Sequence, residues 1–423
     1  MLIAILIVFI IGYAAITLEQ FTRINKSATA LITAGLCWAL YIFSGTAQEQ
    51  VNEQLLHHLA EASGILFFLL GAMTIVELID THDGFDIITR KITTTSKRKL
   101  LWTVCILTFF MSAILDNLTT SIVMLSLVRK MISGKADRMQ FAGMIVIAAN
   151  AGGAWSPIGD VTTTMLWIGK QVTAWQVIYR LFLPSVVCLL LPLIFVAGRM
   201  KGDVSKPALK EKIKTKKEEG ESKLILALGI GSLIFIPVFK TITHLPPFMG
   251  MLLSLGILWA VTEIIHKNKS DKDSYSVASA LQKIDSPSIM FFLGILLAIG
   301  ALQSTGQLTV MAGWLTATIK NVNLLCISIG GLSAIIDNVP LVAAAQGMFS
   351  LQQYPTDHYF WQMIAYTTGT GGSILIIGSA AGIVAMGIEK ISFSWYLKKF
   401  GGWALAGYLA GALVYIFQEN ILH

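Results

Sequence analysis

The chain has 423 residues, of which 55% are hydrophobic and only 13% are charged. Soluble domains carry about 25% charged residues, so this composition excludes a soluble domain and indicates an integral membrane protein with little mass outside the bilayer. The net charge of +7 is therefore better explained by membrane topology than by binding to nucleic acid.

Ten stretches of the chain are apolar enough to cross a bilayer, which takes roughly 17–25 residues. The first lacks a basic segment before it and a small-residue cleavage site, so we interpret it as a retained span and not as a signal peptide. The four cysteines lie singly in apolar runs, which favours small buried hydrophobes over a disulfide or a metal site. The ten stretches are 1–18, 28–44, 62–79, 139–169, 176–198, 223–240, 246–265, 287–303, 361–388 and 400–418.

Two further apolar stretches contain nearly the same hexapeptide, SAILDN at residues 112–117 and SAIIDN at residues 333–338. Each hexapeptide places an acid, Asp116 or Asp337, in the middle of an apolar run. An ionisable side chain at membrane depth costs about 3 kcal/mol on insertion scales, so such a residue is a functional-site hypothesis by default. Because the same hexapeptide occurs twice, we expect two copies of one functional structural element.

Charge placement predicts how these two stretches lie. Most of the 31 Lys and Arg residues fall in a few connecting segments, which the positive-inside rule assigns to the cytoplasm. Two of these segments, 90–99 and 129–138, flank the first stretch, so we expect a re-entrant hairpin with Asp116 at its tip. The second stretch is bracketed by segments poor in basic residues, which predicts a hairpin entering from outside. The cytoplasmic set also includes Arg23 and Lys26, and both termini are expected to be external.

Glycine-rich interruptions follow each hairpin, NAGGAWSPIGDVTTTM at 150–165 and GTGGSILIIGSAAGIVAM at 369–386. The two acids of the hexapeptides are 221 residues apart, and Gly152 and Gly371 are 219 apart, so the offset is nearly constant. We therefore expect two inverted-topology repeats, the pattern of many secondary transporters.

The predicted fold is an all-α integral membrane protein with about ten full spans plus two hairpins. Each repeat contains one re-entrant hairpin and one broken transmembrane helix, and a basic cytoplasmic linker joins the repeats. The expected boundaries are a first repeat at 1–198 with hairpin 100–128 and broken helix 139–169, a linker at 199–223, and a second repeat at 224–423 with hairpin 322–349 and broken helix 361–388.

Hairpin tips and broken helices free backbone groups that can coordinate a cation where they line a cavity. The side chains around them carry hard oxygen ligands, which suit a small hard cation and not copper or zinc. In the second half Ser379 stands where the first half has Asp160, so we expect the first half to be the main cation and proton site. The candidate sodium ligands there are Asp116, Asn117, Asn150, Asp160 and Thr163.

The segments SAILDNLTTS, SAIIDNVPLV and NAGGAWSPIGDVTTT resemble the NhaD-type sodium/proton antiporters of the ion transporter superfamily. The resemblance covers nearly the whole chain. It implies exchange of Na⁺ and Li⁺ for H⁺ without a cofactor, by a homodimer with a scaffold domain and a moving transport domain. It also implies a multi-pass protein of a bacterial inner (plasma) membrane, without nucleotide or nucleic acid as a partner. The binding residues that it implies are Asp116, Asn117, Asn150, Asp160, Thr162, Thr163, Ser333, Asp337, Asn338 and Ser373.

Three alternatives remain at this point. A sodium-coupled dicarboxylate symporter or an arsenite permease would have the same fold, although the symporters carry Ser-Asn-Thr tips where this chain has acids. An intramembrane aspartyl protease is the remote alternative, because two membrane-buried acids are available. Its usual Gly-x-Gly-Asp pattern is not met by Ser-Pro-Ile-Gly-Asp at 156–160, so we expect a transporter and not an enzyme.

Overall fold

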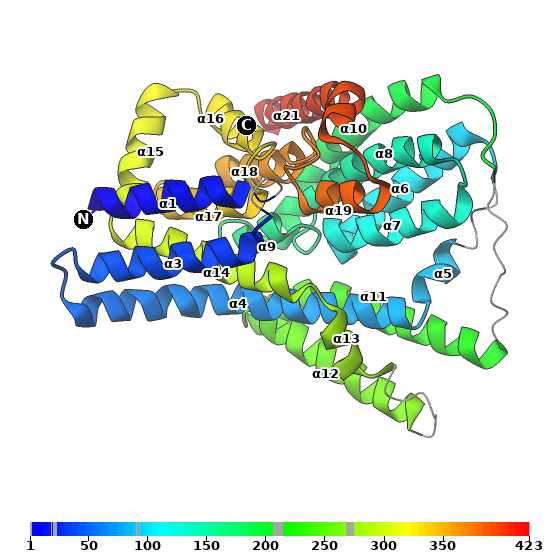
Figure 1. The fold of residues 1–423 in the computed structure, drawn as a ribbon, viewed down its shortest axis with the longest axis horizontal. Coiled ribbons are helices and arrows are strands. Elements are labelled where there is room, and N and C mark those ends of the chain that lie inside the picture. The colour runs from blue at the N-terminus through cyan, green and yellow to red at the C-terminus, as the bar shows by residue number, and fades with distance from the viewer. Residues whose placement is uncertain are drawn as a thin grey trace.

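The computed structural model describes residues 2–422 apart from 18, 20–22, 90–91, 93, 206–214 and 268–274. These residues form an array of helices without a β-strand in the described part, apart from an isolated bridge pair of Ser96 and Asp203, which confirms the predicted helical class (Figure 1). The helices are α1 Leu2–Thr17, α3 Lys26–Ile42, α4 Gln48–Thr81, α5 Gly84–Thr89, α6 Lys97–Leu115, α7 Asn117–Met131, α8 Lys135–Ala154, α9 Val161–Ile168, α10 Ala174–Arg199, α11 Lys216–Thr243, α12 Pro247–His266, α13 Val277–Lys283, α14 Ser286–Ser304, α15 Gln307–Thr318, α16 Val322–Leu332, α17 Asn338–Met348, α18 Tyr359–Gly371, α19 Ala380–Glu389, α20 Phe393–Tyr396, a π-helical turn Leu397–Gly401 and α21 Gly402–Leu422.

Several of these helices have the length and composition of membrane spans. Within the described ranges 7 are long and apolar enough to cross a bilayer: α4, α6, α10, α11, α12, α14 and the continuous α20–α21 segment. Large apolar side chains such as Ile3, Ile242, Ile264 and Phe417 are exposed on the outside of the helices, as expected for a surface that faces lipid. The helices α1 and α3, with 16 and 17 residues, are at the short limit for a membrane span, and the predicted broken helices 139–169 and 361–388 are each divided into two shorter helices.

Four interruptions divide the helices that build the centre of the molecule. The first tip is Asp116-Asn117, where α6 ends and α7 begins, and the second tip is Asp337-Asn338 at the start of α17. The first break (155–160) separates α8 from α9, and the second break (372–379) separates α18 from α19. Asp116 has a φ of 75°, a conformation that is uncommon for a residue with a side chain, so the chain reverses sharply at the first tip.

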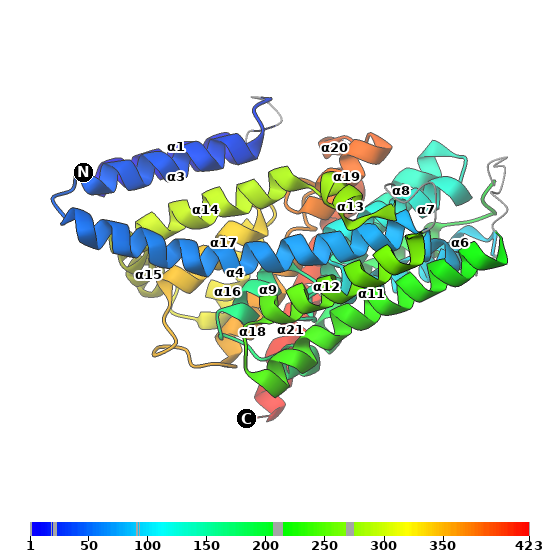
Figure 2. The ribbon, with the colours of Figure 1, turned by 90° about the horizontal axis from the view of Figure 1, so that it is seen from below.

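The helix pairs that carry the two tips approach from opposite ends of the long axis. In Figures 1 and 2, α6 and α7 extend to the right of the molecule, whereas α16 and α17 lie toward the left. Both views place α9, α18 and α19 between these pairs. The tips and breaks of four distant chain segments therefore gather near the middle.

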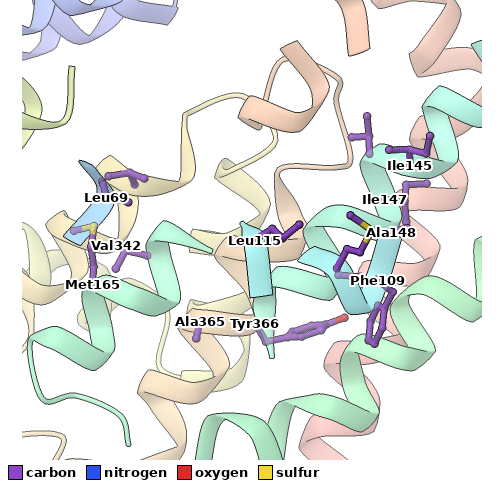
Figure 3. Close-up of a cluster of buried hydrophobic side chains, with 14 of the residues drawn as sticks. Leu69, Phe109, Leu115, Ile145, Ile147, Ala148, Met165, Val342, Ala365 and Tyr366 are labelled. Atoms are coloured by element: carbon purple, nitrogen blue, oxygen red, sulfur yellow. The ribbon is translucent and has the colours of Figure 1, made fainter. Parts of the chain in front are cut away.

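A continuous apolar core surrounds this middle region. Its members come from α4, α6, α8, α9, α17 and α18, so both halves of the chain contribute to it (Figure 3). Dense packing of this kind holds the interrupted helices in fixed positions, because an interior of native density leaves few voids. The labelled members in Figure 3 are Leu69, Phe109, Leu115, Ile145, Ile147, Ala148, Met165, Val342, Ala365 and Tyr366.

Part of the segment between the halves is helical. Helix α11 begins at Lys216 with a capping box between Thr215 and Glu218, so its first turns lie inside the range 199–223 predicted as a linker. The rest of that prediction falls largely on residues 206–214, which lie outside the described residues.

Candidate functional site

Asp160 is the central acid of the site. Its side chain is 1% exposed and caps the N-terminus of α9. The Oδ1 atom accepts hydrogen bonds from the backbone N–H of Thr162 at 3.0 Å and from the Thr162 hydroxyl at 2.9 Å. An N-cap acid also interacts favourably with the positive end of the helix dipole, so the sequence of the first break fixes this carboxylate in place.

Both tips donate to the same carboxylate. The Nδ2 atom of Asn117 lies 3.0 Å from Oδ2 of Asp160, whereas Nδ2 of Asn338 lies 3.4 Å from Oδ1 and 3.5 Å from Oδ2. The contact from the first tip is a normal hydrogen bond, and the contact from the second tip is at the long limit for one. Since an amide carries a donor and an acceptor, rotation of either side chain would present oxygen to a bound cation.

A second set of hydrogen bonds joins the breaks to each other. Asn117 also donates to Oδ1 of Asn150 at 3.1 Å, and Nδ2 of Asn150 donates to the Ser379 hydroxyl at 2.9 Å. Ser379 is the residue that stands in place of Asp160 in the second half, and it caps α19 by accepting from the backbone of Gly382. This series of hydrogen bonds therefore connects the two equivalent break positions, Asp160 and Ser379, through Asn117 and Asn150.

Asp116 occupies a different position from Asp160. Its Oδ1 accepts from the backbone N–H of Thr119 and its Oδ2 from the Thr119 hydroxyl, each at 2.8 Å, so it caps its own helix α7. Asp116 nevertheless lines the same cavity as Asp160. The two acids thus face one space, but the described hydrogen bonds of Asp160 come from other residues.

Asp337 at the second tip is paired with a lysine that the sequence reading assigned to the cytoplasm. The Nζ atom of Lys26, at the start of α3, lies 3.1 Å from Oδ2 of Asp337, and the two side chains are 20% and 19% exposed. The charge pattern assigned Lys26 to the cytoplasmic set, and it did not predict this ion pair. No local motif indicates the contact, because the partners are 311 residues apart.

The other predicted hydroxyl ligands bond to backbone carbonyls. Ser333 donates to the Thr368 carbonyl at 2.9 Å, and Ser373 donates to the Thr370 carbonyl at 2.6 Å. Thr163 is buried, and its hydroxyl lies 3.5 Å from the Ala154 carbonyl. These three side chains stabilise the tips and breaks in this structure and do not reach the Asp160 carboxylate in any described hydrogen bond.

A cavity of about 50 Å³ adjoins the three acids. A space of this size holds a few waters or one partly dehydrated ion, since one water needs on the order of 10–15 Å³. A larger cavity of about 660 Å³ lies between Arg180, His358 and Glu419, but it contains none of the predicted site residues. We therefore locate the site by the convergence of side chains on Asp160. The cavity at the acids is lined by Lys26, Leu69, Met73, Asp116, Asn117, Leu118, Asp160, Val161, Ser288, Phe292, Asp337, Asn338, Val339 and Ala380.

Comparison with known proteins identifies the family. A family model described as "CitMHS: Citrate transporter" matches residues 5–369. The chain belongs to this family. Its relatives include sodium/proton antiporter 1 of Arabidopsis thaliana, which is 48% identical over 419 residues covering 99% of this chain and 73% of that protein. Sodium/proton antiporter 2 of the same plant is 44% identical over 416 residues, with 98% and 99% covered.

The Na⁺/H⁺ antiporter NhaD of Vibrio cholerae is a further relative of this chain. It is 30% identical over 451 residues, which cover 99% of this chain and 92% of that protein. The predicted resemblance to the NhaD-type antiporters is therefore confirmed. Together with the apolar helices, this family membership identifies the chain as a multi-pass membrane transporter.

Proposed function

We propose that this chain exchanges Na⁺ for H⁺ across the membrane by alternating access. The observation that carries the proposal is the Asp160 carboxylate, buried where both tips and both breaks converge. A buried carboxylate without a stable counter-ion is costly, so it is expected to hold either a proton or a cation. The relatives named as sodium/proton antiporters supply the identity of the two ions.

In this mechanism, sodium and protons compete for the same acids. Removing water from a carboxylate favours its neutral form, whereas a cation beside it favours the charged form. Sodium bound at Asp160 would receive further oxygen from Asn117, Asn338 and the adjoining amide of Asn150. Arrival of a proton then releases the ion, and the reverse exchange follows when the cavity opens to the other side. Asp116 faces the same cavity and is the second candidate for proton exchange.

The inverted-repeat architecture is part of the proposal. Ser112 donates to the Ala149 carbonyl at 2.6 Å, and Ser333 donates to the Thr368 carbonyl at 2.9 Å. The donors are 221 residues apart and the acceptors 219, which are the offsets of the hexapeptides and of the glycines. Two re-entrant hairpins entering from opposite faces would bring both tips to Asp160, and the opposed positions of α6–α7 and α16–α17 in Figure 1 support this arrangement.

The glycine contacts support the same duplication. A Cβ atom at Gly152 would lie 2.2 Å from the Phe109 carbonyl oxygen, and one at Gly371 would lie 2.1 Å from the Gly330 carbonyl oxygen. In each half the glycine therefore allows the arm of the hairpin to touch the broken helix.

The family description favours a citrate or dicarboxylate symporter as a second candidate. The charge of the cavity argues against it, because three carboxylates and one ammonium group line the space. A dianion would meet net repulsion there, whereas a small cation would be attracted. An arsenite permease and an intramembrane protease have no comparable support.

The other parts of the proposal follow from the antiporter assignment. We infer that Li⁺ is accepted as well, since hard oxygen ligands suit both small ions. We also infer a homodimer in an inner (plasma) membrane, with a cytoplasmic basic face, a scaffold domain and a moving transport domain. Chemical cross-linking in native vesicles tests the dimer, and its absence there would contradict that part alone.

The test uses the full chain in proteoliposomes with an internal pH dye. A sodium pulse is expected to cause proton movement that Asp160→Asn abolishes, with a loss of at least about 100-fold if Asp160 supplies roughly 3 kcal/mol to the coupled state. Asp203→Asn, an exposed acid outside the cavity, is the matched control and should retain the flux. Labelled citrate uptake in a sodium gradient, with sodium-dependent proton flux missing, would favour the symporter.

The pH dependence gives a second readout. Because protons and sodium compete, the KM for Na⁺ should rise as the pH falls, by at most about tenfold per pH unit for each competing proton. A KM that is unchanged over three pH units would contradict competition at the acids.

A further inference from the structure

The second tip holds its acid in a way that the duplicated architecture does not explain. Asp337 accepts the backbone N–H of Val339 at 3.3 Å and is bonded to the ammonium group of Lys26 at 3.1 Å. Lys26 belongs to α3, which lies outside both tips and both breaks. A fixed positive charge therefore reaches into the ion cavity from a separate element.

A comparison of equivalent positions shows what the lysine replaces. At the first tip, Oδ2 of Asp116 accepts from the Thr119 hydroxyl. The position 221 residues later is Pro340, which has neither a hydroxyl nor a backbone N–H. At the second tip it is again Oδ2 of the acid that is bonded, but the donor is Lys26. The second tip therefore has a cation from a distant part of the sequence, Lys26, where the first tip has the neutral hydroxyl of Thr119.

The surroundings hold the ammonium group at this place. Its Nζ atom lies 4.3 Å from the centre of the Phe291 ring, so the charge sits between a carboxylate and an aromatic face. The backbone N–H of Lys26 donates to the Glu19 carboxylate at 3.1 Å, which fixes the start of α3. With one-fifth of each side chain exposed, the Lys26–Asp337 attraction is less screened by water than that of a surface pair.

Asp160 and Asp337 therefore differ in the charge of the groups that are hydrogen-bonded to them. Asp160 receives neutral donors from Asn117, Asn338 and Thr162 in the described hydrogen bonds, and Asp337 receives a positive charge. We propose that Lys26 is a tethered cation that takes the place of a second transported ion at Asp337, so that the mobile sodium ion binds only on the Asp160 side. This inference rests on the proposed sodium binding and specifies how many ions the site holds.

Sodium binding to the purified full chain, measured with ²²Na⁺ by scintillation proximity, tests the inference. The wild type is expected to bind one ion per chain. Lys26→Met keeps the length of the side chain and removes its charge, which leaves Asp337 open and should raise the count to two. Lys26→Arg should keep one ion, and Lys320→Met, an exposed lysine outside the cavity, is the matched control.

The double variant Lys26→Met with Asp337→Asn separates the charge effect from a structural effect. It removes both charges and should return the count to one, because no acid remains at the second tip. If Lys26→Met alone does not fold, the double variant should recover folding. If Lys26→Met does not fold and the double variant does not fold either, the proposal is overturned, since the unpaired acid would then not be the cause.

Two further outcomes would overturn the inference. One is a count of two ions in the wild type, and the other is an unchanged count and affinity in a folded Lys26→Met variant. Failure of the proposed function gives a different result, namely a wild type without sodium-dependent proton flux. A sodium count that rises in Lys26→Met would support the role of Lys26 even in that case.

Discussion

The two tips have nearly the same hexapeptide but different electrostatic surroundings. At the first tip, Asp116 caps its own helix through Thr119 and the neighbouring Asn117 donates to Asp160 at 3.0 Å. At the second tip, Asp337 is paired with Lys26 and the neighbouring amide reaches Asp160 only at 3.4 Å. The two hexapeptides thus supply similar tip geometry, and residues outside the hexapeptides determine the electrostatic surroundings of each acid.

The breaks show the same divergence. Asp160 and Ser379 both cap a short helix after an interrupted one, so the backbone role is shared. Only Asp160 adds a carboxylate, which makes the site asymmetric around Asn150. An asymmetric site is compatible with one mobile ion even though the surrounding helices come in pairs.

The largest difference in transport activity is expected between alanine variants of the two tip amides, Asn117 and Asn338. In Asn117→Ala, Oδ2 of Asp160 and Oδ1 of Asn150 both lose a donor, so transport should fall about 30- to 150-fold if the lost pairing costs roughly 2–3 kcal/mol. Asn338→Ala removes only a long contact and should reduce transport less than about tenfold.

The comparison is measured as sodium-dependent proton flux at a fixed amount of reconstituted protein. Asn52→Ala, an exposed position on α4, controls for the substitution itself. Equal losses of proton flux in Asn117→Ala and Asn338→Ala would show that the difference between their contacts with Asp160 does not affect transport.

An intermediate effect is expected on stability. Asp337→Asn leaves the Lys26 ammonium group without its carboxylate, and the cost should be about 1–3 kcal/mol, below the value for a fully buried pair because both side chains are one-fifth exposed. Thermal unfolding in detergent measures this, and adding Lys26→Met should restore most of the loss.

Asp116→Asn is the companion variant at the first tip. Its acid has neutral partners, so no charge is left unpaired and the loss of stability should be smaller. If Asp116→Asn destabilises the protein more than Asp337→Asn does, the assignment of different partners to the two tips is contradicted.

Much of the site could be predicted from the chain because the signals are local. Acids and amides inside apolar runs, followed by paired glycines, are costly features that indicate interrupted helices at membrane depth. The structure has helix ends at Leu115, Ala154, Leu332 and Gly371, each within one of those stretches. The class of transporter followed from the resemblance that the same motifs carry, and it agrees with the relatives named as sodium/proton antiporters.

Long-range pairing could not be predicted in this way. The positive-inside rule counts charges near span ends and treats every lysine alike, so it assigned Lys26 to the cytoplasmic set and indicated no partner for it. Its contact with Asp337 depends on how α3 packs against α14, which itself packs against α17, and no short motif encodes this arrangement. The hydrogen bond from Asn150 to Ser379 was missed for the same reason, although the alignment of Ser379 with Asp160 gave a signal that could have indicated it.

The smallest effect concerns the hydroxyl that distinguishes the tips. Thr119→Val keeps the shape of the side chain and the backbone hydrogen bond to Asp116 but removes the 2.8 Å hydroxyl contact. One neutral hydrogen bond contributes about 1 kcal/mol, so transport should fall only about fivefold.

Pro340→Thr makes the reverse change at the second tip and tests whether Lys26 stands in for the missing donor. A threonine there would provide the hydroxyl and the N–H that proline lacks, so Asp337 would have local partners of the kind that Thr119 gives Asp116. In the Pro340→Thr background, Lys26→Met should therefore lower the unfolding temperature less than it does in the wild type. An identical loss in both backgrounds would mean that the lysine and the hydroxyl are not interchangeable, and that the pairing at the second tip depends on the charge alone.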